Sequence, residues 1–249
     1  EFEAKKDGNK LNFKATTKES AIDFENVSFC GEGRLPERPI GPLMDEMKKD
    51  MPGTLKKVGA LGYDGIELLG FFGHSAQEIK RYCAQAGLQP FSAFVTEEED
   101  TAALNEFDGA LLMQGSTAKE KLSYVKEIGC EYIGLLVDDP MDGEMMKKYN
   151  TVVELAAEIG LKVHYHNHAQ EYLNKGENGW RMDEIMAEAD ERMLFEPDLG
   201  WMEIGGCRCE EQVKKYAHRM EIVHLKDYYR EEFDTALPHL FRPVGYGVM

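Results

Sequence analysis

Long apolar runs are missing from this chain. No stretch approaches the ~20 apolar residues that a membrane-spanning helix requires, so we expect no membrane partner. Hydrophobic residues still make up 43% of the 249 residues, which is enough to bury a sizeable core. The composition therefore predicts an ordinary globular protein.

Basic charge is also scarce. Lysine and arginine total 29 against 46 aspartates and glutamates, and the net charge is −17. Such an acidic surface repels phosphate backbones, so nucleic acid is not an expected partner.

Cysteines are few, and their spacing does not suggest disulfides. Cys30, Cys83 and Cys130 lie far apart, as is typical of reduced, mostly buried thiols in a cytoplasmic protein. Cys207 and Cys209 form a single C-x-C pair in a glycine-rich loop. Without a second pair a structural zinc site is disfavoured, and we expect these two thiols to be solvated.

The chain alternates predicted helices and strands that are joined by short glycine turns. Helix, glycine and strand recur in ALGYDGIEL, QAGLQPFSAF, EIGCEYIGLL and EIGLKVHYH. This alternation is typical of parallel βαβ units. Six strands are predicted, and they contain Glu67, Phe91, Ile133, Val163, Leu194 and Val223; a first strand lies unplaced between Ile22 and Met44.

Seven successive units favour an α/β fold of the (β/α)8 TIM-barrel type. An open doubly wound sheet is the competing fold, but no G-x-G-x-x-G follows any predicted strand. The eighth strand is not in the sequence, so we expect a barrel that lacks its last strand–helix unit. Residues 1–26 are polar and are interpreted as an arm or irregular lead-in, and residues 27–249 as the barrel domain.

A histidine-rich segment, KVHYHNHAQEY, is the clearest functional signal. His164, His166 and His168 recur at a spacing of two, so on a strand all three side chains point to one side. Glu171 follows shortly after. We interpret His164, the deepest in its strand, as a hydrogen-bonded core group, and the others as candidate site residues.

Two further polar segments follow apolar runs, EPDLGW and HLKD. The working face of a parallel barrel lies at the carboxyl ends of its strands. Imidazoles and carboxylates delivered there from several strands suit a divalent metal. The candidates at strand ends are His166, His168, Glu171, Asp198, His224 and Lys226.

Other residues near these ends have open roles. Glu67, near the end of the second predicted strand, is a ligand, a base or a structural group. Lys226 either polarises a substrate oxygen or pairs with an acid near Asp227. Trp201 offers a face for stacking a sugar ring, and His74 lies where it can touch substrate. Asn167, between the two site histidines, is a further candidate for binding substrate.

Taken together, GTLKKVGALGYDGIEL, GFFGHSAQEIK, YHNHAQEY, EPDLGW, VHLKDY and PVGYG resemble the sugar phosphate isomerase/epimerase superfamily with the xylose-isomerase-like barrel. The resemblance runs from about Pro42 to the C-terminus. It implies a divalent metal, namely manganese, magnesium or zinc, and a small sugar or sugar derivative as substrate. Carried over to this chain, the implied ligands are Glu171, Asp198 and His224, with His166 as the alternative to Glu171 and His168 as the base.

The chain departs from the family pattern at its end. The last-strand carboxylate of relatives is absent, and Tyr246 stands where relatives often have glutamate. The leading hypothesis is a metal-dependent sugar or polyol isomerase or epimerase that removes a proton α to a carbonyl and forms an enediolate. The alternative within the superfamily is a lyase, either an inosose-type dehydratase or an enzyme that cleaves oxidised glycosides.

Two other classes remain open. A non-catalytic or partner-dependent subunit, as a homo-oligomer or with another chain, is suggested by the missing strand, because an unclosed barrel exposes edges. A DNA-repair nuclease on the same barrel fits poorly with the net charge of −17.

Overall fold

A computed structural model describes residues 2–7, 10–16, 21–28, 40–94, 116–136, 143–228, 241–242 and 247–248. Its central sheet has five parallel strands in the spatial order β10-β7-β6-β5-β4. The strands are β4 Gly65–Leu68, β5 Gln89–Phe94, β6 Tyr132–Leu136, β7 Lys162–His166 and β10 Leu194–Glu196. Spatial order follows chain order, as successive βαβ units require. Five of the six predicted strands are confirmed.

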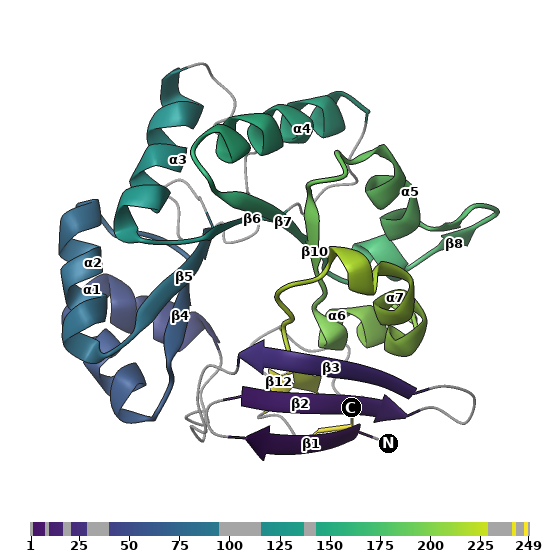
Figure 1. Ribbon diagram of the computed structural model, residues 1–249, viewed down its shortest axis with the longest axis horizontal. Coiled ribbons are helices and arrows are strands. Elements are labelled where there is room, and N and C mark those ends of the chain that lie inside the picture. Colours follow the sequence, from purple (N-terminus) through teal and green to yellow (C-terminus); the bar gives the residue numbers. More distant parts are fainter. Residues whose placement is uncertain are drawn as a thin grey trace.

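Helices lie along the outer side of this curved sheet (Figure 1). They are α1 Ile40–Ala60, α2 Ala76–Ala86, α3 Ser116–Ile128, α4 Gly143–Glu158, α5 Arg181–Glu188, α6 Leu199–Ile204 and α7 Cys209–Tyr216. The described residues also include two 3₁₀ turns, η3 Gln170–Tyr172 and η4 Ala217–Arg219. The short helix α6 was not predicted from the sequence.

Smaller sheets lie outside the parallel one. The segment expected to be an arm forms the antiparallel sheet β1 Phe2–Asp7, β2 Lys10–Thr16 and β3 Ala21–Ser28. Two ribbons pair β8 Lys175–Gly176 with β9 Gly179–Trp180 and β11 Asp227–Tyr228 with β12 Phe241–Arg242. The expected first barrel strand falls on β3, which pairs with β2 and not with β4, and on residues that lie partly outside the described ranges.

The predicted strand from Glu221 to Leu225 is wrong in extent. The structure has one isolated parallel bridge there, between Asp198 and His224. The His224 amide donates to the Pro197 carbonyl at 2.9 Å, and the Leu199 amide donates to the His224 carbonyl at 3.1 Å. Because α6 begins at Leu199, the β10 side has no further extended residues to pair. Within the described residues the sheet is therefore not closed.

Local capping explains where the helices start and stop. Ser75 and Glu78 form a capping box at the start of α2, and Gly87 ends it in the left-handed conformation. Helix α1 has a kink at Asp50. The Asp50 carboxylate accepts from the Gly53 amide at 3.0 Å, so Pro52 sits in the first turn of a new helical segment, where proline is tolerated.

Within the described residues no helix is both long and apolar enough to cross a membrane. Four cysteines are described, and all four are free and buried. This confirms the expectation for Cys83 and Cys130, whereas Cys207 and Cys209 are not solvated as expected. Cys209 opens α7, and its thiol lies 3.2 Å from the Leu199 carbonyl oxygen.

Arg219 ties the end of η4 to α5 and β10. Its guanidinium donates hydrogen bonds to the carbonyl oxygens of Met186, Asp190 and Met193 at 2.7–2.9 Å. Arg219→Ala leaves these partly buried acceptors without donors, and we expect the free energy of unfolding to fall by about 2–4 kcal/mol. Denaturant unfolding measures this. The control Arg208→Ala removes an exposed side chain and is expected to change stability by less than about 0.5 kcal/mol.

Candidate metal centre and active site

The register of two neighbouring strands brings acids and imidazoles together. Glu196 on β10 pairs with His166 on β7, and Leu194 pairs with His164. Because side chains alternate, His164, His166 and Glu196 share the inner face of the sheet. The three side chains are at most 5% exposed. The bridge between Asp198 and His224 places His224 at the same end of the sheet.

A glycine on the intervening strand makes room for this group. Gly134 on β6 lies between Phe94 on β5 and His164 on β7 in the register. A Cβ at Gly134 would clash with the Phe94 ring, which fills the space instead. The Phe94 ring meets His164 and His166 edge to face, with centroids 5.6 Å apart in both cases. The aromatic wedge fixes both imidazoles against the sheet.

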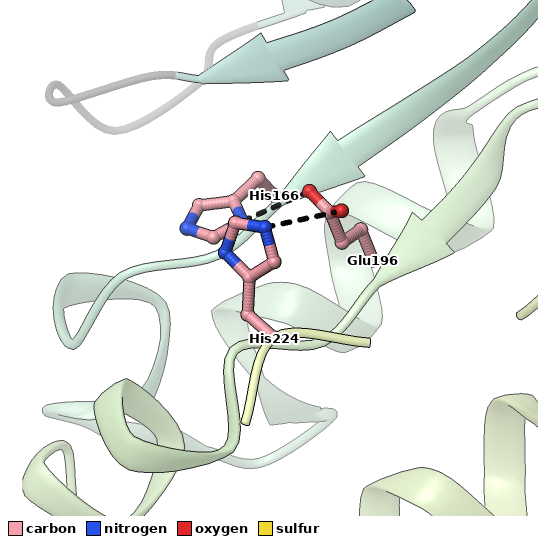
Figure 2. Close-up of side chains that lie close together, drawn as sticks. All are labelled: His166, Glu196 and His224. Atoms are coloured by element: carbon pink, nitrogen blue, oxygen red, sulfur yellow. Dashed lines mark hydrogen bonds and ion pairs between the residues drawn. The ribbon is translucent and has the colours of Figure 1, made fainter. Parts of the chain in front are cut away.

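His166, Glu196 and His224 form a compact triad, hereafter the outer triad. Their ligand atoms all lie within 4.8 Å of one another. His166 Nδ1 is 3.1 Å from Glu196 Oε2, and His224 Nε2 is 3.4 Å from Glu196 Oε1 (Figure 2). His224 Nε2 is also 2.7 Å from Glu67 Oε2, which brings the acid of β4 into the cluster.

Asp198 lies at the edge of the triad, where it contacts two histidines, a lysine and a backbone amide. Its Oδ2 lies 3.7 Å from His166 Nε2 and 3.8 Å from His224 Nδ1. Lys226 Nζ is 2.6 Å from the same oxygen, so Lys226 forms an ion pair with Asp198. Oδ1 accepts from the Trp201 amide at 3.0 Å and caps α6.

Asn167 holds the backbone of Asp198. Its Oδ1 accepts from the Asp198 amide at 2.9 Å, and its Nδ2 donates to the Asp198 carbonyl at 3.3 Å. The Asn167 side chain is fully buried. Its described contacts thus join the ends of β7 and β10, and its contact with substrate stays a prediction.

The electrostatics of the triad suit a cation. Burial, together with the neighbouring His224, lowers the pKa of His166 to about 4 although Glu196 opposes the shift. His166 is therefore neutral near pH 7 and offers a lone pair. Burial alone would lower the pKa of His224, but Glu196 and Glu67 outweigh it and raise that pKa to about 9. The space between the two glutamates thus favours positive charge, which a bound cation would supply in place of the proton.

The donor set fits a divalent metal. Two imidazoles and a carboxylate converge at the mouth of the sheet, with Asp198 beside them, and nitrogen and oxygen donors suit manganese, magnesium and zinc. Glu196 Oε1 is buried and has no hydrogen-bond partner among the described residues. Leaving such an oxygen unpaired is costly, and a cation at this position would satisfy it.

Glu171 does not join the outer triad. Its Oε1 accepts from the buried Tyr165 hydroxyl at 2.7 Å, and its Oε2 accepts from the His168 amide at 3.0 Å. Both oxygens are thereby engaged in holding the turn after β7. The expectation that Glu171 is a metal ligand gives way to its alternative, His166, because the η3 turn directs Glu171 back toward Tyr165.

His168 lies at the rim of the cluster and is half-buried. Its ring meets His166 at 5.4 Å and Trp201 at 5.3 Å between centroids. Lys226 Nζ lies 5.6 Å from the Trp201 ring centroid. His168, Trp201 and Lys226 thus border the triad, and their contact with a substrate stays a prediction.

His74 is placed elsewhere by its contacts. Its ring meets Tyr82 of α2 edge to face at 5.4 Å, and its carbonyl accepts from the Tyr124 hydroxyl of α3. Within the described residues it makes no recorded contact with the triad. Its expected role in substrate binding stays a prediction.

Glu196 is the residue that sequence reasoning missed. Glu196 stands two residues before Asp198, so the two acids repeat the spacing of the histidines on β7. That repeat was the available signal. His164 was expected to be a core group, and it is buried and bonded to Ser92; it also lies 3.1 Å from Glu196.

Comparison with known proteins identifies the fold family. A family model described as the xylose isomerase-like TIM barrel matches residues 55–249. This chain belongs to that family. The five parallel strands of the described residues, which alternate with helices along the chain, match part of such a barrel.

Several relatives of this family member are named inosose dehydratase. The protein from Clostridium botulinum is 26% identical over 212 residues, covering 76% of this chain and 69% of the relative. One from Clostridium perfringens is 30% identical over 229 residues, covering 83% and 75%.

Solved structures share the fold at lower identity. A sugar phosphate isomerase/epimerase from Parabacteroides distasonis has a TM-score of 0.61 at 19% identity, covering 75% of this chain and 73% of that one. A xylose isomerase-like TIM barrel protein from Mycobacterium smegmatis, solved in complex with magnesium, has a TM-score of 0.58 at 15% identity, covering 81% and 75%.

Proposed function

We propose that this protein is a metal-dependent lyase that dehydrates a keto-polyol of the inosose type. The outer triad carries the proposal, because it gathers two imidazoles and a buried carboxylate, and the His224 side chain is partly exposed. The relatives named inosose dehydratase favour a lyase over the isomerase that the sequence first suggested. Both reactions begin with the loss of a proton α to a carbonyl.

His166, Glu196 and His224 would hold the cation, with Asp198 as a neighbouring donor. When bound, a divalent metal acts as a Lewis acid toward carbonyl and hydroxyl oxygens. The protein supplies the fixed positions of the donors. Phe94 braces His166, and Asn167 braces Asp198, so the donors need little reorganisation.

His168 is the proposed base. It takes the α-proton, and the electrons of the C–H bond move toward the carbonyl oxygen. The electrons then return to form the double bond between the α- and β-carbons as the C–O bond at the β-carbon breaks, and the leaving hydroxyl takes the proton that His168 holds and departs as water. The Lys226 ammonium, held beside Asp198, is placed to donate a hydrogen bond to a substrate oxygen, and Trp201 offers a face to the ring.

An activity assay separates the candidates. The chain is loaded with Mn²⁺ and incubated in D₂O with an inosose. We expect a product that has lost one water, seen by mass spectrometry. Deuterium uptake with epimerisation and without loss of water would instead indicate the isomerase or epimerase. If the Mn²⁺-loaded protein causes neither exchange nor loss of water across a panel of keto-polyols, the proposal is wrong.

A further inference from the structure

A second group of donors lies deeper in the sheet, and it shares Glu196 with the outer triad. Glu67, His164 and Glu196 have ligand atoms that all lie within 4.8 Å of one another, and we name them the inner triad. They come from β4, β7 and β10. Their side chains are at most 9% exposed.

Each residue of the inner triad has one buried atom without a hydrogen-bond partner in the part of the chain that the structure describes. These atoms are Glu67 Oε1, His164 Nδ1 and Glu196 Oε1. His164 Nδ1 lies 3.1 Å from Glu196 Oε2, within ion-pair distance of that carboxylate. Three buried polar atoms without hydrogen-bond partners are costly together, and a shared cation would satisfy all three.

Ser92 determines which nitrogen of His164 is available. Its hydroxyl lies 2.9 Å from His164 Nε2. When Nε2 carries the proton and donates it to Ser92, the lone pair of Nδ1 faces Glu196. A metal-binding histidine commonly donates its other ring N–H to such a partner, which fixes the tautomer. Ser92 is adjacent to Glu67 in the register of β4 and β5, so both belong to this inner wall.

From these contacts we propose that the inner triad is a second divalent cation site, with Glu196 bridging the two cations. The inference rests on the metal centre of the proposed function and adds to it. Asp198 is already matched by Lys226 at 2.6 Å, so one divalent cation balances Glu67 and Glu196. A second cation gives the site an excess of positive charge, which suits a substrate that becomes negative when a proton is removed.

Manganese loading of the full chain tests this proposal. Wild-type protein equilibrated with Mn²⁺ alone is expected to hold two ions per chain by elemental analysis. Ions bridged by one carboxylate lie about 3.5–4 Å apart, so their spins couple in the electron paramagnetic resonance spectrum. In His164→Gln we expect one ion per chain and the spectrum of isolated Mn²⁺.

Ser92→Ala provides a milder variant in case His164→Gln does not fold. It keeps all three donors and removes only the tautomer-setting partner, so the Kd of the second ion should rise about 10–100-fold while that of the first is unchanged. Ser123→Ala is the matched control, because that hydroxyl donates to the Lys119 carbonyl within α3. It should leave both affinities unchanged.

The contrary outcomes are distinct. One ion in the wild type that is unaffected by His164→Gln and Ser92→Ala overturns the inner site and leaves the outer metal centre standing. Two ions in both wild type and His164→Gln place the second ion elsewhere and also overturn the inner site. No bound Mn²⁺ overturns both the inner site and the metal centre of the proposed function.

Discussion

Glu196→Gln is expected to abolish both metal binding and turnover. Glu196 is the residue that the two triads share, and its carboxylate lies 3.1–3.4 Å from imidazole nitrogens of three histidines. Glutamine has the same shape but carries no charge. Loss of a residue that only hydrogen-bonds to a metal ligand typically weakens metal affinity about 10–100-fold. Loss of the ligand itself should therefore raise the Kd for Mn²⁺ by more than about 100-fold. Titration with Mn²⁺ measures the change.

Glu171→Gln is the matched control for that experiment. Glu171 is also a buried carboxylate after β7, but its oxygens bind the Tyr165 hydroxyl and the His168 amide. We expect the Mn²⁺ affinity of Glu171→Gln to stay within about threefold of wild type. This change is far smaller than the roughly 10–100-fold loss seen when a residue that hydrogen-bonds to a metal ligand is removed. The reverse pattern, with Mn²⁺ lost in Glu171→Gln and kept in Glu196→Gln, would restore Glu171 as the ligand and reject the outer triad. Thermal unfolding of the metal-free variants confirms that both are folded.

The parallel sheet was predictable because its signals are local. Helices α1, α2, α3 and α4 each end within two residues of a glycine, and a strand begins a few residues later, so this local pattern places β4, β5, β6 and β7. Helix α5 ends at Ala189 instead, and β10 was placed by its apolar run. The cap of α2 was predictable for the same reason, since Ser75, Glu78 and Gly87 act within one turn. Such features depend on neighbours in the chain and not on the tertiary fold.

The missed parts of the fold depend on distant partners. The Glu221–Leu225 run has strand composition, yet it forms only the bridge from His224 because α6 starts immediately after Asp198. Helix α6 is six residues long, too short for a helical period to show in the sequence. Whether an apolar run pairs is decided by the strand beside it.

The candidate site was predictable only where its residues follow a local pattern in the chain. Alternation on one strand predicted that His166 faces the mouth of the sheet. Glu171 was misplaced because a single η3 turn, which no period reveals, returns its carboxylate to Tyr165. Glu196 was overlooked because Asp198 follows so closely, and only the register with His166 shows that Glu196 is the deeper donor.

His168→Ala is expected to stop proton removal while leaving the metal bound. His168 contacts His166 and Trp201 by ring edges, but it belongs to neither triad. A positioned general base contributes about 10²–10⁴-fold, so exchange of the substrate α-proton with solvent should slow by that factor. Nuclear magnetic resonance of the keto substrate in D₂O follows this exchange directly. His218→Ala, which alters an exposed histidine on η4, should exchange the proton at the wild-type rate.

The exchange measurement also separates the base from the ligands. If His168 only shapes the pocket, His168→Ala should weaken substrate binding and leave exchange at saturating substrate unchanged. If it is a ligand, the variant should lose Mn²⁺ together with exchange. The base predicted here loses exchange at every substrate concentration and keeps its Mn²⁺ affinity. That combination requires a proton acceptor beside the metal centre, at the place where the β7 strand ends and the His168 ring turns toward Trp201.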